Sequence, residues 1–174
     1  MDINKIPVGK KVPDEIYVFV ENEKGSQNKL EFDKNLGVMM LDRVLYTSEH
    51  YPGSYGFIPQ TLCDDGDPMD VVVLCTLSIP SGTLVPARPV AVMRMEDEKG
   101  MDDKIVAVPI KDPRFDEIKD LKDLPAHIPK EISHFFETMK QLEPGKWVKV
   151  KGWEGAAAAK KAILDSVALA KKKK

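Results

Sequence analysis

The chain has little cysteine and histidine and no long apolar run. Its 174 residues include only two cysteines and three histidines. Cys63 and Cys75 lack the spacing of zinc ligands, and we interpret both as reduced, small apolar side chains rather than a disulfide framework. No apolar run approaches the ~18 residues of a membrane span, and the start of the chain lacks the charged-then-apolar layout of a secretory signal. These absences predict a cytoplasmic protein.

Several catalytic signatures are also missing. The sequence contains no glycine-rich phosphate loop of the Walker type and no Gly-x-Ser-x-Gly elbow. An EF-hand loop starting at Asp65 would put Met69 at its fifth position and Thr76 at its twelfth, where calcium ligands are needed. The calcium-loop interpretation therefore fails.

Charges are segregated along the chain, although the net charge is only −2. Residues 64–70 and residues 96–103 each carry a net charge of −4, which leaves +6 for the rest. Metal ions together with an anionic substrate would explain both signs, whereas a plain solvated surface would not require this segregation.

The most informative segment is the hexapeptide at residues 65–70, which reads Asp-Gly-Asp-Pro-Met-Asp and precedes a run of valines. Two unit charges about 4 Å apart repel one another by roughly 4 kcal/mol at an effective dielectric near 20. With oxygen ligands and no adjacent His or Cys, the partner that fits best is a hard divalent cation, Mg²⁺ before Ca²⁺ or Mn²⁺. A solvated turn, built from the residues that turns prefer, is the alternative.

Alternating and β-branched runs predict strands over the first 110 residues, at 16–21, 28–33, 38–44, 71–76, 84–95 and 104–109. An apolar stripe over 129–142 predicts a helix, an alternating strand is expected over 146–151, and an alanine-rich helix begins near Gly155 and ends in four lysines. We therefore expect one α+β, mainly β, domain over residues 1–174. Short strands followed by peripheral helices favour a small closed barrel flanked by two main helices.

Other segments offer groups that suit an anionic ligand. Lys29 and Glu31 share one face of their strand, as in an ordinary surface ion pair or a ligand site. Arg43 follows an apolar strand, where its guanidinium would either grip phosphate or pair with Asp42.

Two further segments are open to the same two interpretations. Residues 51–57 combine three aromatics with two glycines, typical either of a packed core turn or of a site where a tyrosine hydroxyl meets an anion. Asp102 and Lys104 are separated by one residue, which pairs a metal-binding carboxylate with a phosphate-binding amine.

Taken together, these segments resemble the soluble family I inorganic pyrophosphatases of prokaryote type. The specific signature is Asp-x-Asp-Pro-x-Asp at residues 65–70. The resemblance spans nearly the whole chain in order, through the stretches at Lys29-x-Glu31, Asp42-Arg43, residues 51–56, residues 97–104 and residues 146–154.

The resemblance implies a five-stranded barrel of the oligonucleotide/oligosaccharide-binding (OB) type and Mg²⁺-dependent hydrolysis of pyrophosphate to two phosphates. A metal-activated water would attack directly, without a covalent intermediate. By motif match, the activating metals would be held by Asp65, Asp70 and Asp102, with Asp70 bridging two of them, and substrate-borne ions by Asp97 and Glu31. The phosphates would be gripped by Lys29, Arg43, Tyr55, Lys104 and Lys140. Asp67 would accept the proton of the attacking water, and the site would be supported by Glu21, Tyr51 and Glu98.

The resemblance also implies several Mg²⁺ ions per subunit, with Mn²⁺ or Zn²⁺ as substitutes and Ca²⁺ as an inhibitor, and a homohexamer built from two trimers. An alternative is a metal-dependent hydrolase of another polyphosphate or a nucleotide. A nucleic-acid-binding barrel is disfavoured because the acidic clusters would repel a phosphate backbone.

The sequence departs from the family pattern at Met139. Family members commonly carry a Tyr-Lys pair where this chain has Met139-Lys140. Because a thioether cannot donate a hydrogen bond, we expect either a weaker phosphate grip, by about 1–3 kcal/mol for a lost bond to a charged group, or another group in its place.

Overall fold

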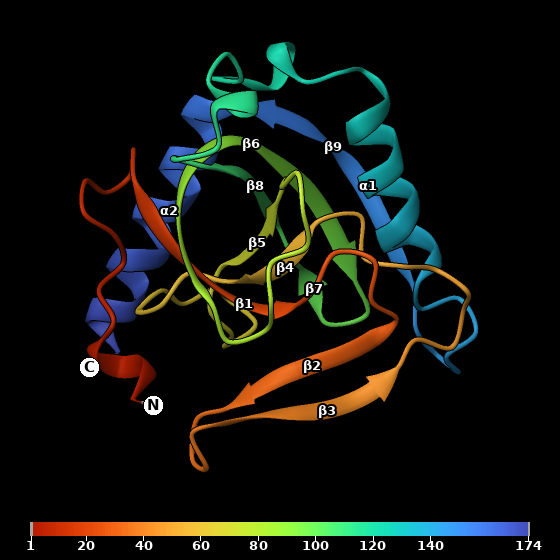
Figure 1. Ribbon diagram of the computed structural model, residues 1–174. Helices are drawn as coiled ribbons and strands as arrows, with labels where there is room; N and C mark the ends of the chain where they lie inside the picture. The colour runs from red at the N-terminus through yellow and green to blue at the C-terminus, as the bar shows by residue number, and fades with distance from the viewer. Residues whose placement is uncertain (1, 174) are drawn as a thin grey trace.

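The computed structural model describes residues 2–173, so the two ends of the predicted 1–174 domain, residues 1 and 174, lie outside it. Figure 1 shows a ring of strands with one long helix on each side and a hairpin standing apart below it. The strands are β1 (Ile16–Asn22), β2 (Asn28–Asp33), β3 (Val38–Val44), β4 (Ser54–Phe57), β5 (Asp70–Val73), β6 (Leu84–Asp97), β7 (Gly100–Met101), β8 (Lys104–Pro109) and β9 (Val148–Gly155). The helices are α1 (His127–Thr138) and α2 (Ala156–Lys172), with short 3₁₀ turns at Ile3–Lys5, Pro113–Phe115 and Leu121–Asp123.

Five strands pair in a closed circuit. β1 pairs with β4 and with β6, β4 pairs with β5, β5 pairs with β8, and β8 pairs with β6. All of these pairings are antiparallel except that of β5 with β8, and β7 and β9 extend the sheet from β6. The mainly β fold with two helices is confirmed. The OB-type topology stays a prediction.

The strands of the ring are covered on both faces, as their sequence pattern indicates. Val71–Val73 of β5 and Ile105–Val108 of β8 are at most 1% exposed. Unbroken apolar runs of this kind suit strands covered on both faces. One face of these strands, formed by Val71, Val73, Ile105 and Ala107, shares a buried cluster with Ala159 and Ile163 of α2. The other face, formed by Val72, Val106 and Val108, belongs to the cluster that α1 joins. α1 buries its apolar stripe in this second cluster, against methionines of β6.

The β2–β3 hairpin is a separate two-stranded sheet. It is joined to the end of β1 through Asn22, whose side chain donates to the Leu30 carbonyl (3.1 Å) and accepts from the Leu30 amide (2.6 Å). Phe32 also packs against Phe19, with ring centroids 5.1 Å apart. The hairpin therefore faces the ring along its β2 edge (Figure 1).

Several predicted boundaries were wrong. β5 begins at Asp70 and ends at Val73 rather than spanning 71–76, and β6 runs to Asp97 rather than to 95. Residues 54–57, which we interpreted as part of a turn, form β4, because the backbone at Gly56 comes close to Phe19 of β1. α1 ends at Thr138 rather than at 142, since the chain turns there with Gln141 N–H donating to the Thr138 carbonyl (3.0 Å). Leu142, the last residue of the predicted stripe, is 65% exposed, and β9 starts two residues later than expected and runs to Gly155.

No helix within residues 2–173 is long and apolar enough to cross a membrane.

We predict that Gly56→Ala severely destabilises the protein. A Cβ atom at Gly56 would lie 1.9 Å from the Phe19 carbonyl oxygen, a clash with backbone that only a shift of β1 from β4 would relieve. The expected loss in free energy of unfolding is more than about 4 kcal/mol, measured by urea denaturation.

Gly82→Ala is the matched control, because a Cβ there meets nothing within 4 Å and only the φ of +82° opposes it. Its expected cost is about 1–2 kcal/mol. Equal losses for the two variants would contradict the close approach of β1 and β4.

Candidate active site

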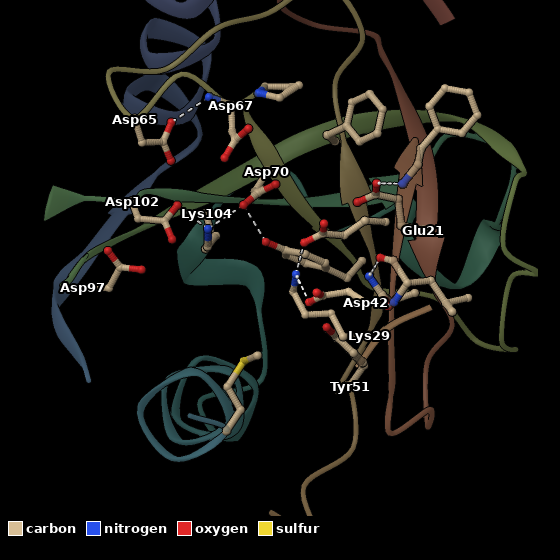
Figure 2. Close-up of a pocket in the computed structure, with 18 of the residues that line it drawn as sticks. Glu21, Lys29, Asp42, Tyr51, Asp65, Asp67, Asp70, Asp97, Asp102 and Lys104 are labelled. Atoms are coloured by element: carbon tan, nitrogen blue, oxygen red, sulfur yellow. Dashed lines mark hydrogen bonds and ion pairs between the residues drawn. The ribbon is translucent and has the colours of Figure 1, made fainter. Parts of the chain in front are cut away.

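A cleft of about 800 Å³ lies between the ring, the β2–β3 hairpin and the end of α1 (Figure 2). Twelve of the fourteen predicted site residues line it: Glu21, Lys29, Glu31, Tyr51, Tyr55, Asp65, Asp67, Asp70, Asp97, Asp102, Lys104 and Lys140. They come from seven separate stretches of the chain, so the ring and hairpin together assemble the site. The other two, Arg43 and Glu98, are not part of the lining.

The acidic hexapeptide is held by a tight loop between β4 and β5. The Cys63 amide donates to the Asp67 carbonyl (2.8 Å), and the Asp67 amide donates to Asp65 Oδ1 (3.0 Å). Gly66 adopts a φ of +93°, a conformation that L side chains resist. Asp65 and Asp67 are therefore exposed at the loop tip, while Asp70 is fixed at the start of β5.

Lys104 lies at the centre of the carboxylates. It faces Asp70 in register across the parallel β5–β8 pair, and its Nζ lies 2.6 Å from Asp70 Oδ2 and also pairs with Asp102. Lys104 is only 2% exposed. Burial works against its charge, but Asp70 and Asp102 outweigh that effect and hold the pKa of Lys104 above its usual value.

For Asp102, in contrast to Lys104, burial has a larger effect on the pKa than the oppositely charged partner. Burial raises the pKa of its carboxyl, and Lys104 offsets only part of that effect. The neighbouring Asp70 raises it further by like-charge repulsion. These carboxylates are thus crowded enough for a further cation to be favourable among them.

Two tyrosines form one wall of the site. Their rings stack with centroids 5.6 Å apart, and the Tyr55 hydroxyl donates to Asp70 Oδ2 (2.5 Å). The Tyr51 hydroxyl is buried without a hydrogen-bond partner among the described residues. Burial raises the pKa of both hydroxyls, so both stay protonated and able to donate.

The hairpin supplies the opposite wall. Lys29 pairs with Glu31 on its own strand and lies 3.1 Å from Asp42 on β3. Behind them, Glu21 Oε1 accepts the Phe32 amide at 2.8 Å. Burial raises the pKa of Glu21 to about 7, and this hydrogen bond offsets only part of the shift.

The segment after α1 closes a third side. Lys140 Nζ lies 2.8 Å from Asp97 Oδ2 at the end of β6. Although burial opposes it, Lys140 leads the interactions that lower the pKa of Asp97. Met139 is 4% exposed and lines the cleft. Glu98 lies beside this pair, 3.8 Å from Lys140 and 2.6 Å from Lys146.

Arg43 lies outside the lining of the cleft, paired with Asp42, which does line it. Its NH2 lies 2.9 Å from Glu143 Oε1, and its NH1 pairs with Asp42. Asp42 itself lines the cleft, a position that the sequence suggested only through its adjacency to Arg43. Glu143 belongs to no motif, so sequence reasoning missed it.

The donor set fits a hard divalent cation in its chemistry, since aspartate oxygens dominate it and no histidine or cysteine lines the cleft. Within residues 2–173, however, no three or more His, Cys, Asp or Glu side chains are grouped closely enough to hold a metal ion as they stand. The Lys104 ammonium lies between Asp70 and Asp102, where a second cation would compete with it.

Comparison with known proteins defines the class. The family model described as inorganic pyrophosphatase matches residues 18–171. An inorganic pyrophosphatase of Saccharolobus solfataricus is 51% identical over 165 residues, which cover 94% of this chain and 96% of the relative. The chain therefore belongs to the inorganic pyrophosphatase family, and the predicted family I, prokaryote-type membership is confirmed.

Solved structures support the same family assignment. The crystal structure of inorganic pyrophosphatase from Thermus thermophilus superposes with a TM-score of 0.96 at 46% identity, covering 98% of this chain and 99% of that one. An inorganic pyrophosphatase structure from Helicobacter pylori gives a TM-score of 0.92 at 46% identity, covering 96% and 99% of the two chains.

We predict that Glu21 makes the stability of the metal-free protein depend on pH. Because its pKa is raised from 4.5 to about 7, the folded state binds more protons than the unfolded state between these values, and stability falls as pH rises through that window. Glu21→Gln removes this dependence. Relative to the unaltered protein, its free energy of unfolding should gain about 1–3 kcal/mol between pH 5 and pH 8.

Urea denaturation in chelator at both pH values measures this difference. A difference between the two proteins that stays constant from pH 5 to pH 8 would contradict the raised pKa.

Proposed function

We propose that this protein hydrolyses inorganic pyrophosphate to two phosphates, with Mg²⁺, by direct attack of water and without a covalent intermediate. The observation that carries the proposal is the interleaving of aspartates with lysines around one cleft, in a chain of this family. Carboxylates suit divalent cations, and amines suit the oxygens of a highly charged phosphate.

Asp65, Asp70 and Asp102 would hold the activating ions, and Asp97 and Glu31 would receive ions that arrive with the substrate. A bound Mg²⁺ supplies Lewis acidity, which favours deprotonation of water and offsets charge on the phosphates. Burial raises the pKa of Asp102, and repulsion from Asp70 adds to that effect, so a cation bound beside them would stabilise the ionised carboxylate.

The chain's own cations would bind the substrate. Lys29, Lys104 and Lys140 each lie against a cleft carboxylate, and Tyr55 donates to Asp70. Held in this way, the three ammonium groups are fixed before the phosphates arrive, whereas the single O–H of Tyr55 would have to leave Asp70 to reach a phosphate. Such preorganised donors stabilise the charge that develops on the leaving phosphate. Arg43 would reach the substrate from the rim.

Asp67 is the proposed base. It lies at the exposed tip of the 63–70 loop, facing the other carboxylates in Figure 2. Its carboxylate makes no hydrogen bond or ion pair with any described residue, so both oxygens are available to accept the proton of an attacking water. Asp65 differs, because one of its oxygens already accepts the Asp67 amide.

The proposed localisation, assembly and ligand range follow the family resemblance. We propose a cytoplasmic, single-domain protein that assembles as a homohexamer of two trimers and takes no nucleic acid as ligand. The acidic lining of the cleft supports the last point, since it would repel a phosphate backbone in the absence of metal.

We predict that phosphate release from pyrophosphate requires both Mg²⁺ and Asp67. Release by the purified protein should collapse in chelator, and Asp67→Asn should lower kcat by about 10²–10⁴-fold, the range of general-base catalysis. A colorimetric phosphate assay measures both.

Asp64→Asn is the matched control, since Asp64 belongs to the same loop but does not line the cleft. Activity that survives Asp67→Asn would move the base elsewhere. Release from tripolyphosphate or ATP that exceeds release from pyrophosphate would favour the broader phosphohydrolase instead.

We further predict that Met139→Tyr tightens substrate binding. Met139 lines the cleft beside Lys140, so a tyrosine there would bring a hydroxyl to the phosphates. The expected change is a fall in KM of about tenfold, for one added bond to a charged group. Met139→Leu, which adds no donor, is the control, and unchanged KM and kcat in Met139→Tyr would contradict a missing bond at this position.

A further inference from the structure

Arg43 and Glu143, which are 100 residues apart in sequence, join the β2–β3 hairpin to the segment after α1, and both of these elements contribute residues to the cleft. The Arg43 Nε–H donates to Glu143 Oε1 at 3.0 Å, and NH2 lies 2.9 Å from the same oxygen. The Arg43 side chain is 24% exposed and that of Glu143 only 10%. Burial opposes the positive charge, but Glu143 and Asp42 together hold the pKa of Arg43 above its usual value. The pair is therefore well sheltered from solvent.

These contacts leave part of the guanidinium available. Glu143 engages the edge formed by Nε and NH2, and Asp42 engages NH1. A guanidinium has five N–H donors. With three engaged by described residues, two remain for a ligand at the rim of the cleft.

The same pair fastens the outer edge of the hairpin. On the β2 edge, Asn22 and Glu21 bond to the backbone of Leu30 and Phe32. On the β3 edge, the Arg43–Glu143 pair joins residues 38–44 to the segment after α1. Among the residues that the structure describes, no other ion pair or side-chain hydrogen bond joins 38–44 to a residue outside 27–47.

Backbone hydrogen bonds and the packing of neighbouring residues fix the position of Glu143. Its amide donates to the Lys140 carbonyl (2.9 Å), and its carbonyl accepts the Lys146 amide (3.2 Å). Four residues earlier in this segment, Met139 is buried among the aromatics of α1. The Lys140 side chain pairs with Asp97. The segment from 139 to 146 therefore gives Glu143 a fixed position from which to hold Arg43.

We propose that Glu143 is a positioning residue for Arg43. It holds the β3 edge against the segment after α1 and presents the two remaining N–H donors of Arg43 to a substrate phosphate. The identity of the ligand rests on the proposed function, whereas the clamp on the hairpin stands on the geometry alone. Glu143 touches no reacting group and acts only through Arg43.

A double-mutant cycle tests this role. Glu143→Ala should raise KM for pyrophosphate about tenfold and leave kcat within about twofold, because the affected interaction is with the bound substrate. In an Arg43→Ala background, Glu143→Ala should have no further effect on KM. Equal effects of Glu143→Ala in the two backgrounds would overturn the proposal.

Two further variants separate charge from packing. Glu143→Gln keeps an acceptor for the Arg43 Nε–H without the charge, so its KM should lie between those of the unaltered protein and Glu143→Ala. Glu131→Ala removes an exposed glutamate from α1, in the same part of the chain, and should change neither constant. A Glu131→Ala effect as large as that of Glu143→Ala would indicate a general loss of negative charge, contrary to the proposal.

Amide hydrogen exchange on the full-length protein tests the clamp without reference to activity. Glu143→Ala should speed exchange in residues 38–44 and leave β6 and β8 unchanged. Unchanged exchange in 38–44 would overturn the clamp. If the unaltered protein releases no phosphate from pyrophosphate, the proposed function fails while this measurement still decides the clamp, and calorimetric binding of inorganic phosphate to the same variants replaces KM.

Discussion

One buried ammonium, that of Lys104, pairs with two carboxylates at the point where the ring of strands meets the cleft. Without a cation there, Asp70 and Asp102, whose side chains are only 26% and 20% exposed, would repel one another as two like charges. The register of β5 and β8 puts Lys104 opposite Asp70. The same solution recurs at the other walls, where Lys29 lies against Asp42 and Lys140 against Asp97. The acidic site is therefore compatible with a stable fold because each wall carries its own counter-charge.

This pairing also relates stability to chemistry. A carboxylate held by an amine is ionised and immobile, the state in which it binds a hard cation well. An amine held by a carboxylate stays protonated, the state in which it binds phosphate. The interactions that stabilise the folded protein thus maintain the charge states that the proposed hydrolysis of pyrophosphate would use. Glu21 and Asp102 are exceptions. Burial raises the pKa of Glu21 to about 7, where a backbone amide is its hydrogen-bond partner, and burial also raises the pKa of Asp102 despite its pairing with Lys104.

Much of this was predictable from the sequence, for identifiable reasons. Alternation and β-branching located β2, β3 and β8 at their observed bounds, and twelve of the fourteen proposed site residues meet in one cleft. β4 was missed because all four of its residues are buried, so no polar-apolar alternation marks it. The orientation of Arg43 depends on Glu143, a contact across 100 residues that local pattern does not encode. Strand order and the separation of the hairpin are likewise products of long-range pairing.

The parallel pairing of β5 with β8 has a consequence for how the molecule forms. Asp70 and Lys104 are 34 residues apart, and only this pairing brings them into register. Contacts of high sequence separation form slowly, because the entropy of closing the intervening chain is lost before the contact compensates for it. A chain that has formed its hairpin and helices but has not yet joined β5 to β8 has no assembled site. The appearance of activity in a newly made chain therefore reports the closure of the ring rather than the formation of secondary structure.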